Sequence, residues 1–374
     1  MSWYKVKLGK LGRVVTGKTP PTKDPDNFGS DFPFITPGDM HGTKFANTTE
    51  RKLSLKGGYV IKGSRLPPGS VCVSCIGSDM GNVLFTTCDS FTNQQINSII
   101  PSEQYCADFI YYLMKTKKSE ILGIGTAGGS AVPIISKSEF CDLDVIVPNL
   151  PVQRRIASVL GAYDDLIENN RRRIALLEKM ARELYRERFV RRVKGVGKMT
   201  LEQIAKFVRG KVIVKDATTP GDIPVVAGGM EPAYYHNVSN TGAPVITVSG
   251  SGANAGYARM YFENVWASDC SWVDAERTPY IRFVYCFLKD NDAELRNAQK
   301  GAAQPHVHAK DVNALMVSDD IDTIMSFEKL VTPMFDEIAS LTFQTRNLTR
   351  QRDRLLPRLM SGKIDVEALV KEEK

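Results

Sequence analysis

Apolar residues recur on a strict 4-3 spacing in two long stretches of the chain, one near its middle and one at its C-terminal end. This spacing places a single apolar seam along a helix, and such a seam is buried against a partner. The pattern therefore predicts two long helices that pack against each other. The seam positions are Ile156, Leu160, Tyr163, Ile167, Asn170, Ile174, Leu177, Ala181 and Leu184 in the first stretch, and Phe327, Val331, Met334, Ile338, Leu341, Thr345, Leu348, Arg352, Leu355 and Leu359 in the second.

The remaining sequence has the mixed strand and loop pattern of two globular heads. Within them we expect helices at 107–121 and about 280–298, a loop at 125–130 and a closing strand at 145–147. The central helix should extend to about Val193. The last helix should begin near Ser326, with a kink or a fresh start at Thr332 and a C-cap at Gly362. The predicted segments are a first head at 1–149, a central helix at 150–194, a second head at 195–324 and a C-terminal helix at 325–374.

The second head repeats the first. Residues 73–81 match residues 248–256, with valine, serine and two glycines in register. Further matches follow in the same order, namely 32–35 with 223–226, 38–40 with 228–230, and 133–143 with 305–315. Preserved order with drifting loop lengths is typical of a duplicated domain. We therefore predict an α+β protein in which two pseudo-symmetric α/β heads are joined by a long antiparallel coiled coil. At ~1.5 Å per residue, each helix would be roughly 60 Å long, with the heads at its opposite ends.

Composition limits the class of protein. The 374 residues, 43% of them hydrophobic, are enough for two modest cores. Because no apolar run reaches the length of a membrane span and no signal-peptide core is present, we expect a soluble, cytoplasmic protein without membrane contact. Seven cysteines fit a reducing compartment. Cys72 and Cys75 form a lone CxxC, which we expect in the core rather than at a metal.

The net charge of +7 is concentrated on the central helix. Residues 151–198 contain 13 Lys and Arg against 6 Asp and Glu, so the rest of the chain sums to zero. Arg171, Arg172 and Arg173 are consecutive there. A basic stripe on a rigid rod suits a phosphate backbone, whereas a solvated flank or a face for a protein partner would look the same in the sequence. Both interpretations stay open.

Sequence motifs for catalysis are missing. There is no Walker A motif and no Asn/Asp-Pro-Pro-aromatic tetrapeptide of an amino-methyltransferase. Gly250, Gly252 and Gly256 follow a strand, as in a dinucleotide-binding loop, but residues 257–262 read as a strand where that fold requires a helix. We expect no catalytic residue, cofactor or metal in this chain.

Polar side chains gather in the loops of both heads at matching positions. Asn and Gln can pair bidentately with adenine, Ser and Thr can meet several base edges, and glycines let a backbone approach closely. Any one of these residues could be an ordinary turn residue, but their matched occurrence favours a shared surface. The candidate DNA-binding residues are Lys18, Ser74, Ser78, Asp79, Asn82, Asn93, Gln94, Gln95 and Ser130 in the first head, Arg171, Arg172 and Arg173 in the central helix, and Ser249, Ser251, Asn254, Tyr257, Gln304, His306 and His308 in the second head.

Two heads, each followed by a long helix, resemble the specificity (S) subunits of type I restriction-modification enzymes over essentially the whole chain. The last helix departs from the pattern in lacking the basic excess of the central one. The motifs that carry the resemblance are Leu-Pro-Val-Gln-Arg-Arg-Ile at 150–156, Asn-Asn-Arg-Arg-Arg-Ile at 169–174, Leu-Glu at 177–178 and Arg-Asp-Arg-Leu-Leu-Pro-Arg-Leu-Met-Ser-Gly-Lys-Ile at 352–364.

The resemblance implies that the heads are target recognition domains and that the protein is non-catalytic. It would bind double-stranded DNA at a bipartite, asymmetric target and hold two modification (methyltransferase) subunits. The full complex would add ATP-dependent restriction (translocase and nuclease) subunits. S-adenosylmethionine and ATP with Mg²⁺ are then expected on those partners. The alternatives are a component of a methylation-only system, an enzyme in its own right, and a coiled-coil scaffold with no sequence-specific DNA role.

Overall fold

The chain forms two compact units in the computed structural model, which describes residues 3–42, 44–45, 49–127, 132–191, 197–297 and 306–366. Unit 1 consists of Met1–Asn169 with Thr345–Lys374, and unit 2 consists of Asn170–Gln344. Each unit therefore combines one head with part of each long helix. The two units do not follow the bounds of the four predicted segments, because each long helix is divided between unit 1 and unit 2.

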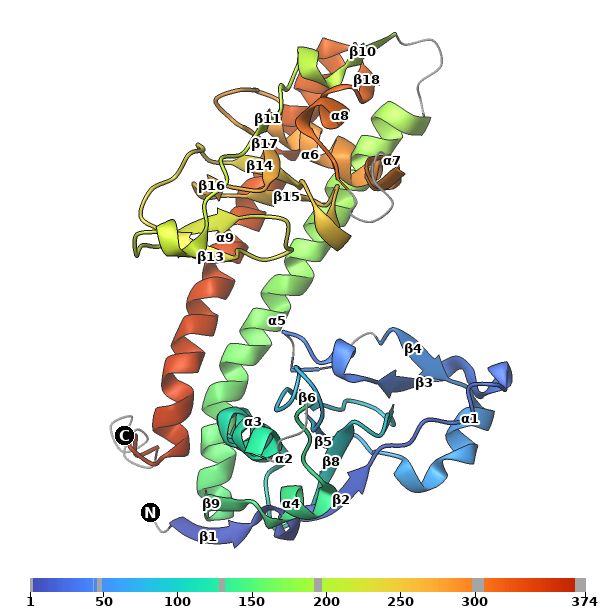
Figure 1. Ribbon diagram of the computed structural model, residues 1–374, viewed down its shortest axis with the longest axis vertical. Helices are drawn as coiled ribbons and strands as arrows, with labels where there is room; N and C mark the ends of the chain where they lie inside the picture. The colour runs from blue at the N-terminus through green and yellow to red at the C-terminus, as the bar shows by residue number, and fades with distance from the viewer. Residues whose placement is uncertain are drawn as a thin grey trace. The chain divides into compact units, whose positions relative to one another are not determined.

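Three small sheets form the strand framework of unit 1 (Figure 1). Its strands are β1 (Trp3–Lys7), β2 (Gly12–Thr16), β3 (Phe28–Ile35), β4 (Arg51–Leu53), β5 (Val71–Ser74), β6 (Val83–Phe85), β7 (Phe91–Thr92), β8 (Ile96–Pro101) and β9 (Asp144–Pro148). The largest sheet is antiparallel in the order β2-β8-β5-β6. A second sheet has the order β4-β3-β7, with β3 and β7 parallel, and β1 pairs with β9.

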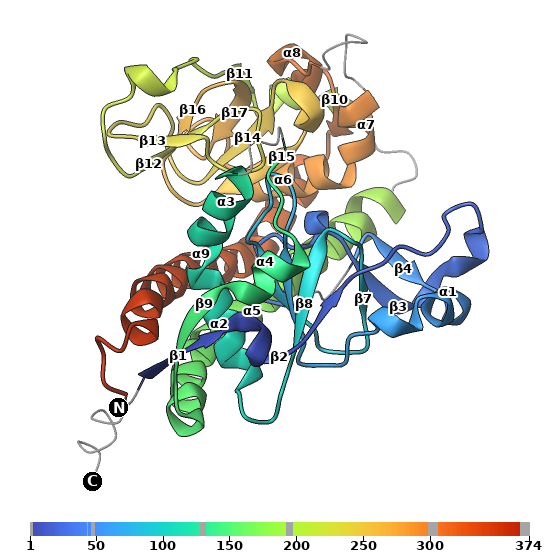
Figure 2. The same cartoon turned by 60° about the horizontal axis from the view of Figure 1, so that its bottom comes forward.

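The helices of this head are α1 (Leu55–Val60), α2 (Ala107–Thr116), α3 (Lys118–Ala127) and α4 (Lys137–Asp142). Helix α1 lies beside β3 and β4 in both views (Figures 1 and 2). The prediction of one helix over 107–121 is wrong, because the helix ends at Thr116 and α3 begins at Lys118. The predicted loop at 125–130 is also wrong for 125–127, which are helical, while 128–130 lie outside the described residues. Gly125 packs against Met80, whose Cε would lie 2.5 Å from an added Cβ.

Unit 2 repeats this framework strand for strand. Its strands are β10 (Lys198–Thr200), β11 (Val208–Arg209), β12 (Ile223–Val226), β13 (Tyr234–His236), β14 (Val245–Ser249), β15 (Ala258–Tyr261), β16 (Trp266–Ala267), β17 (Cys270–Asp274) and β18 (Met316–Ser318). The sheets have the orders β11-β17-β14-β15, β13-β12-β16 and β10-β18, and β12 pairs with β16 in parallel, as β3 does with β7. The predicted duplication is confirmed, and so is the strand reading after Gly256.

The helices of the second head are α6 (Ile281–Asp290), α7 (Asp292–Asn297) and α8 (Ala309–Asn313). The single helix expected at about 280–298 is thus broken at Asn291, at the point that corresponds to the break after α2. Helix α1 has no helical counterpart among the described residues between β13 and β14. The second head therefore has a shorter connection at this edge.

The two long helices are α5 (Leu150–Arg186), followed by a π-helical turn over Glu187–Arg191, and α9 (Ile321–Met360). Helix α9 begins earlier than predicted because Asp320 caps it, accepting the Thr323 amide at 3.0 Å. No new helix begins at Thr332, since α9 continues through it. The predicted C-cap is confirmed by Gly362, which has a φ of 70° and whose amide donates to the Leu359 carbonyl at 3.1 Å.

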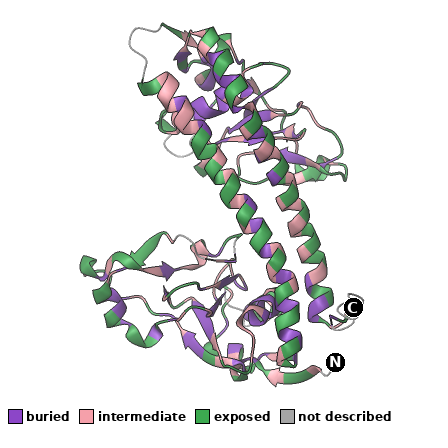
Figure 3. Cartoon of the chain, turned by 180° about the vertical axis from the view of Figure 1, so that it is seen from behind, coloured by how far each residue is buried: buried purple, intermediate pink, exposed green. Residues whose placement is uncertain are grey.

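The helices pair antiparallel along the predicted seam. In unit 2, Arg173 forms an ion pair with Glu337, and further along α5 the Tyr185 ring lies 6.1 Å from the Phe327 ring. In unit 1, Asp164 pairs with Arg352. Buried and exposed residues alternate along both long helices (Figure 3), and the buried ones belong to the core clusters of the two units.

A buried polar side chain near the start of each long helix helps to fasten that helix to its head. Gln153 of α5 accepts the amide of Cys106, at the start of α2, at 2.9 Å and donates to the Pro148 carbonyl at 2.8 Å. Glu328 of α9 accepts the amides of Arg282 and Phe283, in the first turn of α6, at 3.2 and 2.8 Å. Both contacts satisfy amides that a helix leaves unpaired at its N-terminus. The repeat therefore includes the way in which head and helix are joined.

The CxxC pair belongs to the core, as predicted. Cys72 and Cys75 are buried free thiols in the largest sheet of unit 1 and in the turn after it. Burial raises the pKa of the Cys72 thiol to about 12 and that of Cys75 to about 11. Among the helices in the described ranges, none has both the length and the apolar character needed to cross a membrane.

Candidate nucleic-acid interface

The loop that follows the central strand has the same backbone hydrogen bonds in the two heads. After β5, the Ser74 amide donates to the Asn82 carbonyl at 2.9 Å and the Gly81 amide donates to the Ser74 carbonyl at 2.8 Å. After β14, Ser249, Tyr257 and Gly256 form the matching pair of bonds, at 3.0 and 2.9 Å. The glycines have positive φ, 82° at Gly81 and 85° at Gly256, which explains the glycine repeat.

Two further segments meet this loop in each head. In the first head, the Cys75 amide donates to the Gln95 carbonyl at 2.8 Å, and Ile76 bridges to Ile134. In the second head, the Gly250 amide donates to the Asp269 carbonyl at 3.2 Å, and Ser251 bridges to His306. Three segments that are far apart in sequence therefore converge at one place in each head. Most of the predicted DNA-binding residues of the heads lie on them.

The two serines that end the central strands are buried. Ser74 is fully buried, and its hydroxyl has no hydrogen-bond partner. Ser249 is 3% exposed, and its hydroxyl donates to the Gly228 carbonyl at 2.9 Å. Burial counts against direct base contact by either side chain, although both were predicted from their polarity. Both serines support the loops from below.

The other predicted residues of the first head are at least partly accessible. Ser78, Gln94 and Lys18 are exposed, and Gln94 accepts a hydrogen bond from Thr19 at 2.8 Å. Asn93 donates to the Gln95 side chain at 2.8 Å, so these two amides hold each other.

Two predicted residues of the loop after β5 have basic side chains as neighbours. Asn82 accepts from Lys118 at 2.7 Å, and Asp79 lies 3.6 Å from the His41 Nε2 atom. Ser130 lies outside the described residues.

The second head gathers charged groups at the corresponding place. Ser251 donates a hydrogen bond to the Asp269 carboxylate, and the rings of His306 and His308 stack with centroids 6.1 Å apart. Asn254 and Tyr257 are half-buried, and Gln304 lies outside the described residues.

A cavity of about 510 Å³ opens beside this cluster. Its polar and charged lining includes Arg209, Asp269, Ser271, His306, His308 and Lys310. Arg209 and Lys310 were missed by sequence reasoning, because they are about 100 residues apart and neither belongs to a polar loop run. Arg209 directly precedes Gly210 at the end of β11, as Thr16 precedes Gly17 at the end of β2. That correspondence was the only sequence signal for it. The cavity has the lining of a site for an anion or for a base edge.

The arginines of the central helix contact the chain itself. Arg172 and Arg173 are exposed, Arg171 is half-buried, and Arg173 forms the ion pair with Glu337. This pair leaves both readings of the basic stripe open, because the guanidinium of an exposed pair can still reach a phosphate or a protein partner.

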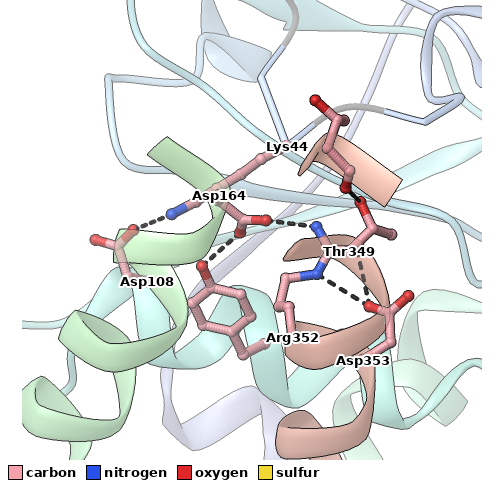
Figure 4. A network of polar contacts seen from close by, with 8 residues as sticks. Lys44, Asp108, Asp164, Thr349, Arg352 and Asp353 are labelled. Atoms are coloured by element: carbon pink, nitrogen blue, oxygen red, sulfur yellow. Dashed lines mark hydrogen bonds and ion pairs between the residues drawn. The ribbon is translucent and has the colours of Figure 1, made fainter. Parts of the chain in front are cut away.

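A buried polar network lies where the long helices meet in unit 1 (Figure 4). Tyr112 of α2 donates to Asp164 of α5 at 2.5 Å, and Arg352 of α9 donates to the other oxygen of that carboxylate at 2.5 Å. Burial, followed by the charge of Asp164, raises the pKa of Tyr112. Lys44 reaches Asp108 nearby at 2.6 Å and lies between aromatic rings. Every charge in this network has a partner, so it holds the helices together and presents no free nucleophile or base.

In the parts of the chain that the structure describes, no group of three or more His, Cys, Asp or Glu side chains is placed to hold a metal ion. What the structure does gather, twice, is a set of accessible amides, hydroxyls and charges on three converging segments.

Comparison with known proteins finds several that this chain resembles. A family model described as type I restriction modification DNA specificity domain matches residues 1–179. The chain is 25% identical over 410 residues to the type I restriction enzyme MjaIX specificity subunit of Methanocaldococcus jannaschii, which covers 98% of this chain and 94% of that protein. It is 34% identical over 175 residues to the HindI specificity subunit of Haemophilus influenzae, covering 45% of this chain and 38% of that protein.

The fold has a solved counterpart. The crystal structure of a type I restriction-modification S subunit from M. genitalium superposes with a TM-score of 0.61 at 18% identity, covering 96% of each chain. At this identity the likeness concerns the fold. Residues 1–179 therefore match the DNA specificity domain of type I restriction modification, and the chain is similar over nearly its whole length to a type I restriction enzyme specificity subunit.

Proposed function

We propose that each head reads one half of a bipartite, asymmetric DNA target. The observation that carries this proposal is the pair of converging loop sites, which have the same backbone and different side chains. The first head presents Gln95 and Ile134 where the second presents Asp269 and His306. Side chains that differ in hydrogen-bonding groups read different base edges in the major groove, so the two half-sites should differ.

The half-sites would be separated by a spacer of fixed length and arbitrary sequence. Helix α5 is continuous from Leu150 to Arg186, across the residue at which the two units divide. A spacer longer by one base pair moves one half-site by ~3.4 Å and rotates it by about 35°, taking 10–10.5 base pairs per turn. For the two heads to follow this rotation, the packing between the paired helices would have to be distorted, which costs free energy. Binding should therefore fall steeply with each added pair.

The chain would be a non-catalytic scaffold. Its internal repeat supports two modification subunits per chain, with restriction subunits joining the full complex. S-adenosylmethionine and ATP with Mg²⁺ would belong to those partners. Turnover of labelled S-adenosylmethionine by the isolated chain would contradict this division of labour, and so would a native mass that saturates at one modification subunit.

The arginines at 171–173 would supply affinity rather than specificity. Their replacement by glutamine should weaken binding to all sequences alike and flatten the salt dependence by ~0.9 per lost phosphate contact. A changed sequence preference would contradict this role. If the arginines face a modification subunit instead, assembly will fail while the salt slope stays the same.

A methylome of cells that carry this chain with its modification subunits tests the central proposal. The expected result is one methylated motif made of two different short half-sites at one fixed spacing. Methylation at a continuous palindrome, or at half-sites with many spacings, would count against it.

A further inference from the structure

A Gly-Lys step occurs at the same place in both heads, directly after the strands β2 and β11. The Gly17 amide donates to the Ile96 carbonyl at 3.1 Å, and the Gly210 amide donates to the Cys270 carbonyl at 2.8 Å. The Lys18 and Lys211 amides donate to Thr92 and Ala267, both at 2.9 Å. The two steps are therefore equivalent positions of the repeat, which sequence matching had not aligned.

Packing explains the glycines. A Cβ on Gly17 would lie 2.1 Å from the Asn93 carbonyl oxygen, and one on Gly210 would lie 2.3 Å from the Ser268 carbonyl oxygen. Real Cβ atoms essentially never come within 3 Å of another heavy atom. Only glycine therefore allows the chain to approach the neighbouring segment this closely at positions 17 and 210. The same packing says nothing about the residue that follows.

The lysines have no comparable structural role. Both are exposed, and within the described ranges neither forms an ion pair. The Lys211 ammonium lies 5.9 Å from the Trp266 ring centroid, which orients the side chain without neutralising it.

Both lysines lie close in sequence to residues that contact the converging segments of their head. Thr19, the residue after Lys18, bonds to the Gln94 side chain at 2.8 Å. Beyond Lys211, the Ile213 amide donates to the Ser268 hydroxyl at 3.2 Å. An unpaired cation therefore stands beside the converging segments in each head.

The side chains around the lysines have diverged between the heads, whereas the lysine is the same. A feature shared by two half-sites of different sequence is the sugar-phosphate backbone. We propose that Lys18 and Lys211 are a duplicated pair of phosphate contacts, one per head, that seat each head on the DNA irrespective of its bases. The inference rests on the proposed reading of one half-site by each head, and it adds Lys211 to the candidate interface.

The test uses the chain assembled with its modification subunits, titrated with a duplex that carries the methylome-defined target and with a scrambled duplex, over a series of KCl concentrations. The variants are Lys18→Gln, Lys211→Gln and the double variant. Lys52→Gln and Lys206→Gln are matched controls, since these lysines are exposed on other parts of the same heads. Lys18→Arg and Lys211→Arg keep the charge.

Each glutamine variant should lower affinity for both duplexes by the same factor, roughly 3- to 10-fold, and reduce the slope of log K against log[KCl] by ~0.9. The double variant should reduce the slope by about 1.8, twice the contribution of one contact. The arginine variants should bind like the parent protein, and the controls should keep the full slope.

An unchanged slope in the glutamine variants overturns the inference, and so does a loss confined to the target duplex, which would make the lysine a base contact. These outcomes leave the proposed function intact if the parent complex still prefers its target. If the parent complex binds the target and the scrambled duplex equally well, the proposed function itself is contradicted.

Discussion

Ile134 and His306 occupy the same place in the two heads, each bridged to the loop that follows the central strand. Ile134 is 51% exposed, an apolar side chain that offers a methyl surface. His306 lines a cavity with Arg209 and Lys310. At the bridged position the first head therefore presents an apolar side chain, where the second presents a histidine beside charged groups.

The backbone beneath these side chains is nearly unchanged. The loop hydrogen bonds recur in both heads at lengths that differ by at most a few tenths of an ångström. A buried amide or carbonyl without a partner costs free energy, so the framework cannot drift freely. An accessible side chain carries no such constraint. The duplication thus separates a scaffold that must stay constant from a surface that is free to differ.

The helix pairs of the two units differ in a similar way. In unit 1, the side chains of Asp164 and Arg352 are 5% and 13% exposed. In unit 2, those of Arg173 and Glu337 are 50% and 42% exposed. A buried pair is costly to break from one side, whereas an exposed pair contributes little, because water and salt screen it. The two ends of the same seam are therefore expected to respond differently to mutation.

The largest effect is expected from exchanging a whole head. If residues 198–318 are replaced by the second head of another specificity subunit, one half-site should change completely, with affinity for the original target reduced by ~10³-fold or more. The first half-site and the spacer should stay as they were, which a methylome of the chimera would reveal. A chimera that altered both half-sites would show that the heads do not read independently.

Breaking the buried ion pair should be the next largest effect. Asp164→Ala leaves Arg352 and Tyr112 without their shared partner and should lower the free energy of unfolding of unit 1 by about 3–5 kcal/mol. The matched change in unit 2, Glu337→Ala, should cost ~0–1 kcal/mol. Urea unfolding of both variants measures the contrast. Equal losses would mean that burial does not distinguish the two ends of the seam.

Replacing the glycines of the Gly-Lys steps tests whether an added side chain is excluded equally in the two heads. Gly17→Ala and Gly210→Ala should each destabilise their own head by ~1–3 kcal/mol, because the new methyl group overlaps a carbonyl oxygen of the neighbouring segment. Gly63→Ala is the control, since nothing lies within 4 Å of its added Cβ. Thermal unfolding suffices as the measurement. Tolerance in only one head would break the equivalence of the two steps.

The most local effect, confined to one base-pair position, is expected from exchanging the side chains at the bridge. Ile134→His should alter base preference at one position of the first half-site, and His306→Ile should do so in the second, each by ~1–3 kcal/mol. Binding to a panel of duplexes with single base-pair changes would locate the position. If the base preference of both variants is unchanged, the residues that contact the bases do not include those at the bridge.

The sequence by itself determined the duplication, the pairing of the two long helices and the glycine-bounded loops. These follow from spacing and from local backbone demands: a seam every 3.5 residues, and glycine at positive φ in Gly81 and Gly256. Heptad spacing also marked Arg352 as a seam position, although only the structure shows that its partner is Asp164.

The tertiary structure decided which polar residues are accessible and which residues meet. Ser74 and Ser249 are polar and adjoin the loops, yet both are buried. The segments that bury them lie far away in sequence, so local sequence could not predict this. Helix α3 includes Gly125 although glycine is a poor helix former, and the contact with Met80 shows why a side chain does not fit there: an added Cβ would lie 2.5 Å from the Met80 Cε atom. Arg209 of β11 and Lys310 of α8 come together only in the folded chain, where both line the same cavity. Burial and long-range contact depend on the whole fold, so local spacing predicted the framework and left the chemistry of the site to the packing of the chain.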